Sequence, residues 1–435
     1  MTIPVEETTG PSRLGEVRAE AGSWFAANWD ADLTLGEWWA RLAESGWGYP
    51  TWPVGRFGRG LSNEAASVVH DERRRLGILG APAGIASMLA GPTLLAHGTP
   101  EQLDRYLGGI ATGQHIWCQL FSEPSAGSDL ASLRTRAERD GDHWVINGQK
   151  VWTSGAHKAS YGILIARTDP DAPKHQGISY FVIDMRQRGV EVRPLREMTG
   201  RAVFNEVYFD NAVVPAENLL GDLHGGWRVT LTTLANERSG LGASASAGGG
   251  KLDVPDQDLG VRLRDVLATA VMIDDVVPKR RGFELLLEIA RQRGLTADPV
   301  ARQELMRNYI AGEVARISGL RVAAAAEAAR RAGGRGGEAS PIVSVQKMAA
   351  SLNLHRLGRA SLNFEGPYGM LSGPDALVED RAFETIATAF MISIGGGTDQ
   401  IQRNIVGERV LGLPGEPRVD KDVSFRDLPV SGVAR

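Results

Sequence analysis

One stretch of the sequence, residues 117–156, constrains the fold more than any other part of the chain. The pair Gly141-Asp142 lies between its two halves, and in the second half apolar and polar residues alternate around this pair. Alternation beside a Gly-Asp pair is typical of a β-hairpin with a tight turn. We therefore expect β-strands in the middle of the chain, with a hairpin at this point.

Two features of the same stretch suit a ligand. The loop 124–129, Pro-Ser-Ala-Gly-Ser-Asp, has little bulk, so its backbone and hydroxyl groups can come close to a bound molecule. Trp152 is followed by Thr153 and Ser154, which sets an aromatic plane beside two hydroxyl groups. A planar cofactor needs such a face and such donors at its edge. The alternative is an ordinary hairpin with a core tryptophan and a surface turn.

Composition limits the class of protein. A chain of 435 residues, 43% hydrophobic and 23% charged, predicts a globular protein of about two or three domains. The net charge of −4 gives no general attraction to nucleic acid or to an anionic membrane. The single Cys118 excludes an intrachain disulfide and a multi-cysteine metal site, and the histidines show no metal-ligand spacing. No apolar run reaches the ~18–20 residues of a membrane span, and the polar start is unlike a signal peptide, so we expect a cytoplasmic protein.

The periodicity of the sequence changes twice along the chain. Residues 1–116 predict an N-terminal helical domain, residues 117–225 a central domain of short strands, and residues 226–415 a helical bundle followed by a tail, 416–435. The expected strands after the hairpin are 161–167, 178–184, 190–193 and 204–209. The expected helices of the bundle are 227–242, 261–292, 299–332, 341–361, 375–391 and 398–411, with loops at 243–260 and 333–340.

Two segments taken together resemble the flavin-binding segments of the acyl-CoA dehydrogenase family. They are SEPSAGSDLASLRTRA, residues 122–137, and INGQKVWTSGA, residues 146–156. The sequence GPTLLAHGTPEQLDRYLGGI, residues 91–110, is similar to the N-terminal helical domain of that family. The resemblance covers roughly residues 35–415. It implies an α+β multidomain fold, with an N-terminal helical domain, a central β-barrel-like domain and a C-terminal helical bundle.

The resemblance also implies an activity. In this family a glutamate removes the α-proton of an acyl-CoA thioester while the β-carbon gives a hydride to N5 of FAD, and a trans-2-enoyl-CoA results. The electrons pass to an electron-transferring flavoprotein. The implied assembly is a homo-oligomer, dimer or tetramer, or a heterotetramer with a related subunit.

Four residues of the opening stretch match positions of the family's site. Ser122 matches a residue that bonds the flavin ring, Trp152 the aromatic residue that packs on it, and Ser154 the hydroxyl near N5. Ser128 matches a residue along the path of the thioester and pantetheine. For any one serine alone, a turn or a helix cap is the alternative.

The resemblance places the nucleotide half of FAD against the helical bundle and a neighbouring subunit. Arg291 matches a pyrophosphate-binding arginine. Thr398 and Gln400 match a nucleotide-binding turn at a helix N-terminus, although Thr398 would also serve as a plain N-cap. Asn363 stands where the family has the glutamine of a Gln…Gly-Gly turn, and the nearby Pro367 has no N–H to donate.

The catalytic base is the position where the sequence departs most from the family. Many members have a glutamate directly before the Gly-Thr of the last motif, and Gly396 stands there. A subset places the glutamate on the first long helix after the β domain, directly before an arginine, which matches Glu237-Arg238. Glu237 borders an apolar helix face, where desolvation would raise its pKa. We expect Glu237 to be the base and Arg238 to lie on the substrate side as its ion-pair partner; a solvated Glu-Arg pair is the alternative.

Two other functions stay open at the level of sequence. The first is a non-catalytic subunit of a heteromeric dehydrogenase, which Asn363 and Pro367 favour and the intact serine and tryptophan set opposes. The second is an acyl-CoA oxidase, which would depend on access of oxygen to the flavin. The missing side chain at Gly396 leaves room for bulky acyl groups, steroid side chains included.

Overall fold

The computed structural model describes residues 11–247, 258–267, 282–331, 342–417 and 420–428. Its N-terminal part is helical, as predicted. The helices are α1 (Pro11–Asn28), α2 (Leu35–Ser45), α3 (Asn63–Arg75), α4 (Gly91–His97), which follows the π-helical turn η2 (Ala86–Ala90), and α5 (Pro100–Ala111). The predicted start of α5 is confirmed, because the Thr99 side chain accepts a hydrogen bond from the backbone N–H of Gln102.

The central part is one curled sheet. Its strands are β1 (Trp117–Leu120), β2 (Arg136–Asp140), β3 (His143–Lys150), β4 (Tyr161–Arg167), β5 (Ile178–Asp184), β6 (Val190–Leu195) and β7 (Phe204–Pro215). The predicted hairpin is confirmed: β2 and β3 pair antiparallel, and Gly141 takes a left-handed φ of 58° in the turn. The strand order is β1-β4-β2-β3-β7-β6, with β5 on the other side of β4. β1 runs parallel to β4 and stands at one end of this strand order.

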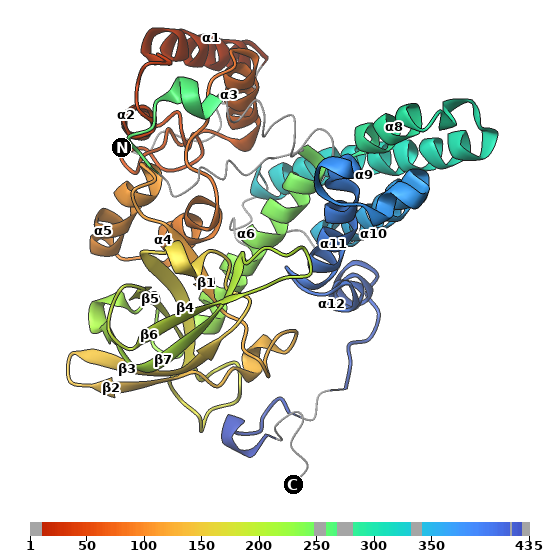
Figure 1. Ribbon diagram of the computed structural model, residues 1–435. Coiled ribbons are helices and arrows are strands. Elements are labelled where there is room, and N and C mark those ends of the chain that lie inside the picture. Colours follow the sequence, from red (N-terminus) through yellow and green to blue (C-terminus); the bar gives the residue numbers. More distant parts are fainter. Residues whose placement is uncertain (1–10, 248–257, 268–281, 332–341, 418–419, 429–435) are drawn as a thin grey trace.

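The third part is the helical bundle. Its elements are α6 (Gly226–Ala247), α8 (Phe283–Gln292), α9 (Pro299–Arg331), α10 (Ile342–Glu365), the short strand β8 (Leu377–Asp380), α11 (Arg381–Ile394) and α12 (Asp399–Ile405). In Figure 1, α8, α9 and α10 project together to one side of the molecule. The predicted layout of helical domain, β domain and helical bundle is thus confirmed.

Several predicted boundaries in the bundle were wrong. The helix expected over 261–292 is not continuous, because Gly282 is extended and α8 begins only at Phe283. The helix α10 continues to Glu365, beyond its expected end at 361. The helix α6 continues to Ala247, whereas a loop was expected from residue 243, because the alanines and serines of 243–247 still favour helix and the glycine run begins only at 248. The helix expected from residue 375 begins only at Arg381, as α11, because residues 377–380 form the strand β8. The predictions for 248–257, 268–281 and 333–340 fall outside the described residues.

The helix α6 lies where the three parts of the molecule meet (Figure 1). On its buried face the hydroxyl of Thr233 is 2.9 Å from that of Thr93 in α4 and 3.0 Å from that of Tyr180 in β5. The hydroxyl of the preceding residue, Thr232, pairs with His97 of α4 at 2.8 Å. These contacts fix the rotation of α6 relative to both the helical domain and the sheet. Within the described residues, none of the helices has the length and hydropathy needed to cross a membrane.

Candidate active site

A buried ion pair joins the two halves of the 117–156 stretch. The Nζ atom of Lys150 lies 2.8 Å from Oε1 of Glu123 and also donates to the carbonyl oxygen of Phe121 at 2.9 Å. The carboxylate of Glu123 accepts the backbone N–H groups of Arg134 and Thr135. Burial alone would raise the pKa of Glu123, but Lys150 and these two N–H groups outweigh it and lower that pKa. The pair therefore ties the loop after β1 to the end of β3 from inside the protein.

Backbone pairing then sets the position of the three predicted flavin contacts in this stretch. The N–H of Val151 donates to the carbonyl oxygen of Ser122 at 2.9 Å, so Ser122 lies beside the start of the 151–155 loop. Thr153 exchanges two backbone hydrogen bonds with Asn205 at the start of β7, each 3.0 Å long. The structure thus places Ser122 beside the start of the loop that carries Trp152 and Ser154.

Trp152 lies in a strained and exposed conformation. Its φ of 61° is left-handed, a costly choice for a bulky residue, and its side chain is 62% exposed. Its ring and that of Phe204 form a T-shaped pair, at a centroid distance of 6.0 Å. Beside it the Thr153 hydroxyl is buried and has no hydrogen-bond partner. An open aromatic face next to an unpaired buried hydroxyl fits the flavin that the resemblance implies.

Glu237, the predicted base, contacts the strand that leads into this loop. The amide of Gln119 in β1 donates to Oε2 of Glu237 at 3.1 Å, across 118 residues of sequence. Gln119 lies three residues before Ser122, so the Glu237 carboxylate contacts the same segment that carries this predicted flavin contact. Both side chains are half-buried. Arg238 follows on α6, and its side chain lies outside the described part of the structure.

Ser128 is exposed in the small-residue loop. Its neighbour Asp129 forms an ion pair with Lys174 at 3.0 Å and accepts a hydrogen bond from Ser132 at 2.5 Å. The loop is therefore held through Asp129, directly after Ser128, while Ser128 itself is exposed.

The last predicted motif forms a well-anchored helix start. Thr398 caps α12, accepting the backbone N–H of Ile401 at 3.2 Å, which confirms its role as an N-cap. The next residue, Asp399, is buried and bonds to Lys347 and Ser351 of α10 at 3.2 and 2.8 Å. Gln400 is exposed at this helix start. Gly396 just before it has a left-handed φ of 65°, a conformation that disfavours a glutamate there.

The remaining predicted contacts lie around a second region of the bundle. Asn363 and Phe364 of α10 line a cavity of about 860 Å³ together with the arginines Arg307, Arg356 and Arg359. Arg291 is exposed in the last turn of α8. Two residues later the Arg293 guanidinium lies 4.9 Å from the ring centre of Tyr368, beside the turn that follows Asn363.

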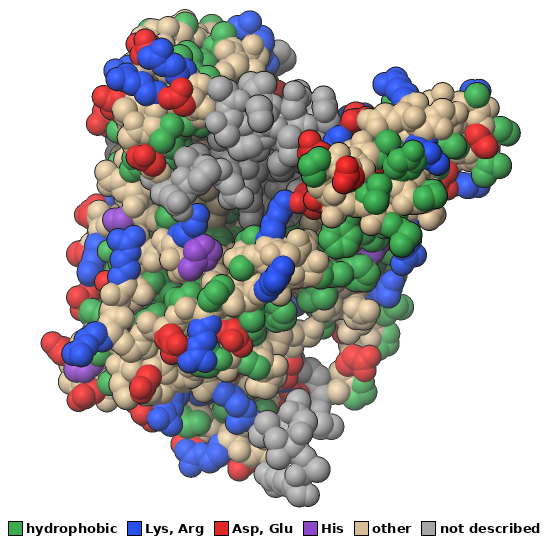
Figure 2. Space-filling model, in the orientation of Figure 1, with side chains coloured by type: hydrophobic (Ala, Val, Ile, Leu, Met, Phe, Trp, Pro, Cys, Tyr) green, Lys and Arg blue, Asp and Glu red, His purple; other side chains and the backbone are tan. Residues whose placement is uncertain are grey.

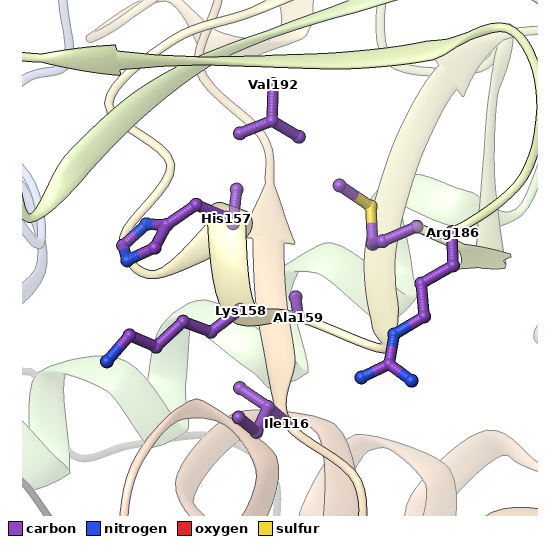
Figure 3. A pocket seen from close by; sticks show the side chains of 8 residues that line it. Ile116, His157, Lys158, Ala159, Arg186 and Val192 are labelled. Atoms are coloured by element: carbon purple, nitrogen blue, oxygen red, sulfur yellow. The ribbon is translucent and has the colours of Figure 1, made fainter. Parts of the chain in front are cut away.

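A third region, a smaller cavity of about 460 Å³, lies on the β domain beyond Ser154 (Figure 3). His157 and Lys158 lie on one side of it and Arg186 on the other, with Val192 and Ile116 at its two ends. None of the predicted site residues lines it.

Sequence reasoning gave no role to several residues that shape the site. Glu123 and Lys150 lie inside the two motif segments quoted above. Charged residues next to apolar strand positions were the signal that could have predicted a buried ion pair there. Gln119 and Arg293 carried no such signal, because their roles depend on contacts with α6 and with the turn after α10.

Family models match the chain over most of its length. The N-terminal domain of acyl-CoA dehydrogenases matches residues 16–114, the middle domain residues 118–212 and the C-terminal domain residues 268–411. The acyl-CoA dehydrogenase IpdE1 of Mycolicibacterium smegmatis is 34% identical over 433 residues, which cover 92% of this chain and 98% of that protein. FadE34 of Mycobacterium tuberculosis, also an acyl-CoA dehydrogenase, is 38% identical over 86% of this chain, but the match spans only 45% of FadE34.

Solved structures agree with these matches. The Tcur3481-Tcur3483 steroid acyl-CoA dehydrogenase is 28% identical, with a TM-score of 0.70 over 94% of this chain and all of that one. The ChsE4-ChsE5 complex from Mycobacterium tuberculosis is 25% identical, with a TM-score of 0.64 over 96% of this chain and all of that one. The chain therefore belongs to the acyl-CoA dehydrogenase family, an enzyme family that works with a flavin cofactor.

Proposed function

We propose that the protein dehydrogenates an acyl-CoA thioester between its α- and β-carbons, giving a trans-2-enoyl-CoA, with Glu237 as the base. The observation that carries this proposal is the 3.1 Å hydrogen bond from Gln119 to Glu237. It connects the one carboxylate expected to remove the α-proton to β1, the strand that leads to Ser122. Gly396 has no side chain to take that role.

In this proposal the chain's own residues position and move a proton. The amide N–H of Gln119 orients the Glu237 carboxylate, and the half-buried setting limits its contact with water. The Glu237 carboxylate then takes the α-proton of the thioester. The threonine contacts of α6 with α4 and β5 keep the helix, and hence Glu237, at a constant distance from β1.

We propose FAD as the flavin. When bound, it supplies the acceptor for the hydride that leaves the β-carbon. Ser122, Trp152 and Ser154 would hold the ring, and Thr398 and Gln400 the nucleotide half at the start of α12.

The cavity beside Asn363 supports a contribution from a neighbouring subunit. Three arginines around it suit a pyrophosphate, since guanidinium groups bind phosphate oxygens in pairs. The Arg293 guanidinium contacts the Tyr368 ring, in the turn that follows Asn363. We therefore propose Arg293, together with Arg291, as a ligand of the pyrophosphate.

An exposed apolar surface supports assembly with a second chain of this family. On α9 the exposed apolar residues recur at helical spacing on one face: Met306, Ile310, Val314, Ile317 and Leu320. On α11 Phe383, Phe390 and Ile394 are also exposed, and Figure 2 shows apolar side chains gathered where Figure 1 places α10 and α11. Surfaces of this kind mark subunit interfaces. We propose that a further copy or a related subunit covers them, and that an electron-transferring flavoprotein reoxidises the assembly.

The test is anaerobic reduction of the purified protein. Its bound flavin should bleach when acyl-CoA thioesters of graded chain length and branching are added, steroid side-chain thioesters included. Bleaching should disappear in Glu237→Gln and persist in Glu44→Gln, a matched change of an exposed glutamate on α2. Oxygen consumption without another acceptor would instead identify an oxidase.

One other function has an observation in its favour. Gly396 and Pro367 both depart from the family's site, which favours a subunit that supports a catalytic partner. If the protein purifies colourless and gains flavin only with a second gene product, this alternative replaces the self-sufficient enzyme.

A further inference from the structure

The described segment 420–428, far from the site in sequence, packs against two loops of the β domain. Figure 1 shows it beneath the sheet, separated from the helical bundle. Phe425 donates its backbone N–H to Ala172 at 3.0 Å, and Arg426 donates to Pro170 at 2.9 Å. Ser424 also forms a β-bridge with Pro173. The segment thus adds a short stretch of pairing to the loop 168–177, which connects β4 to β5.

Arg167 connects this segment to the small-residue loop. Its guanidinium lies 3.7 Å from the centre of the Phe425 ring, and Phe425 is only 7% exposed. The same guanidinium donates to the carbonyl oxygens of Ala131 at 2.6 Å and of Lys174 at 2.7 Å. A desolvated cation–π contact of this kind is among the stronger ones. The Phe425 ring therefore closes one face of the group that holds the backbone just after Ser128.

Lys174 forms a second connection. Its Nζ atom pairs with Asp420 at 2.6 Å and with Asp129 at 3.0 Å, and its side chain is only 10% exposed. One cation thus joins the segment 420–428 to the residue directly after Ser128. On the inner side the same loop is held by Glu123, through the N–H groups of Arg134 and Thr135.

We infer that the segment 420–428 is a clamp that sets the position of loop 124–135 for the acyl-CoA thioester, with Phe425 and Arg167 as positioning residues. This inference rests on the proposed function, because Ser128 lies on the thioester path only if the chain binds acyl-CoA. The inner ion pair holds the flavin side of the loop, and the clamp holds its outer, substrate side. Loss of the clamp should therefore weaken substrate binding more than flavin binding or turnover.

The experiment compares Phe425→Ala with Phe425→Tyr, which keeps the ring, and with Arg426→Ala. Arg426 is the matched control, because its side chain reaches only the largely exposed Asp171. In Phe425→Ala the amides of 124–135 should exchange with deuterium about tenfold faster, and KM for the acyl-CoA should rise about five- to tenfold, with kcat and flavin content unchanged. Phe425→Tyr should restore both quantities, and Arg426→Ala should leave both unchanged.

Two results would overturn the clamp. Unchanged exchange in 124–135 of Phe425→Ala would show that the segment does not hold the loop. Faster exchange with an unchanged KM, or with a fall in kcat alone, would show that the loop is held but not for the substrate. If the unaltered protein shows no bleaching with any acyl-CoA, the proposed function fails separately, while the exchange of 124–135 still decides whether the segment holds the loop.

Discussion

The β-domain loops and the helical bundle carry matching halves of the predicted flavin site, but they are completed differently. Around Ser122 the chain supplies its own support: a buried ion pair, backbone pairing with β7 and a carboxylate from α6. Around Asn363 the structure has a cavity lined by arginines and an apolar face on α9 that is open to solvent. The first region is held by contacts within one chain, whereas in our proposal a second chain covers the other region.

The largest expected effect tests the first region. Glu237→Gln should lower the rate of flavin reduction by acyl-CoA about 10²- to 10⁴-fold, because it removes the proton acceptor but keeps the shape of the side chain. Stopped-flow absorbance under anaerobic conditions measures this rate. Gln119→Ala should give a smaller loss, about tenfold, since it only frees the carboxylate. Equal losses in the two variants would contradict the assignment of Glu237 as the base.

The inner ion pair gives the next effect. Lys150→Met should lower the free energy of unfolding by about 3–5 kcal/mol, because Glu123 would be left buried without its cation. Lys158→Met, at an exposed lysine, should change it little. Chemical denaturation followed by tryptophan fluorescence measures both. Since a buried pair can often be replaced by apolar residues, the double variant Glu123→Leu with Lys150→Met should recover part of the loss.

The second region can be tested by charge. Val314→Asp, in the exposed stripe of α9, should weaken subunit association by about 2 kcal/mol, roughly 30-fold in Kd, because it buries an unpaired carboxylate in the interface. Arg316→Ala, two residues away and in an exposed ion pair with Glu313, is the control. Analytical ultracentrifugation over a dilution series measures the change. An unchanged mass distribution would mean that the stripe is not an interface.

The pH dependence sharpens the contrast further. The pKa of Glu123 lies below its ordinary 4.5, so its ion pair stabilises the protein fully above that value, and the contribution is lost as the pH falls through the folded pKa. The difference in thermal midpoint between the unaltered protein and Glu123→Gln should therefore be constant from about pH 7 to about pH 5 and shrink below. If the difference in thermal midpoint grew as the pH fell below about 5, the lowered pKa of Glu123 would be contradicted.

The smallest effect separates stability from function. Trp152→Gly should raise the free energy of unfolding by about 1 kcal/mol, because glycine adopts the φ of 61° without strain. The same change should reduce the flavin content, since the exposed ring would be missing. Trp152→Phe should keep most of the flavin. Thermal scans measure the stability, and the visible spectrum measures the flavin content. A glycine variant that is less stable than the unaltered protein would show that the backbone at Trp152 is not strained.

The sequence predicted what short-range patterns encode. Alternation and the Gly-Asp pair predicted the β2–β3 hairpin, and Thr99-Pro100 predicted the start of α5. The motifs around Ser122 and Trp152 identified the family, because their residue types and order are specific even without contacts. The end of α6 was misplaced, because the alanines of 243–247 favour helix and the glycine run begins only at 248.

By itself, then, the sequence determined the family, the order of the three parts and the candidate base. Only the tertiary structure decided that Glu237 meets Gln119, that Lys150 is buried against Glu123, and that Phe425 closes over Arg167. The physical reason is distance along the chain. Periodicity and turn chemistry act over a few residues, whereas a hydrogen bond across 118 residues depends on how α6 packs between the helical domain and the sheet.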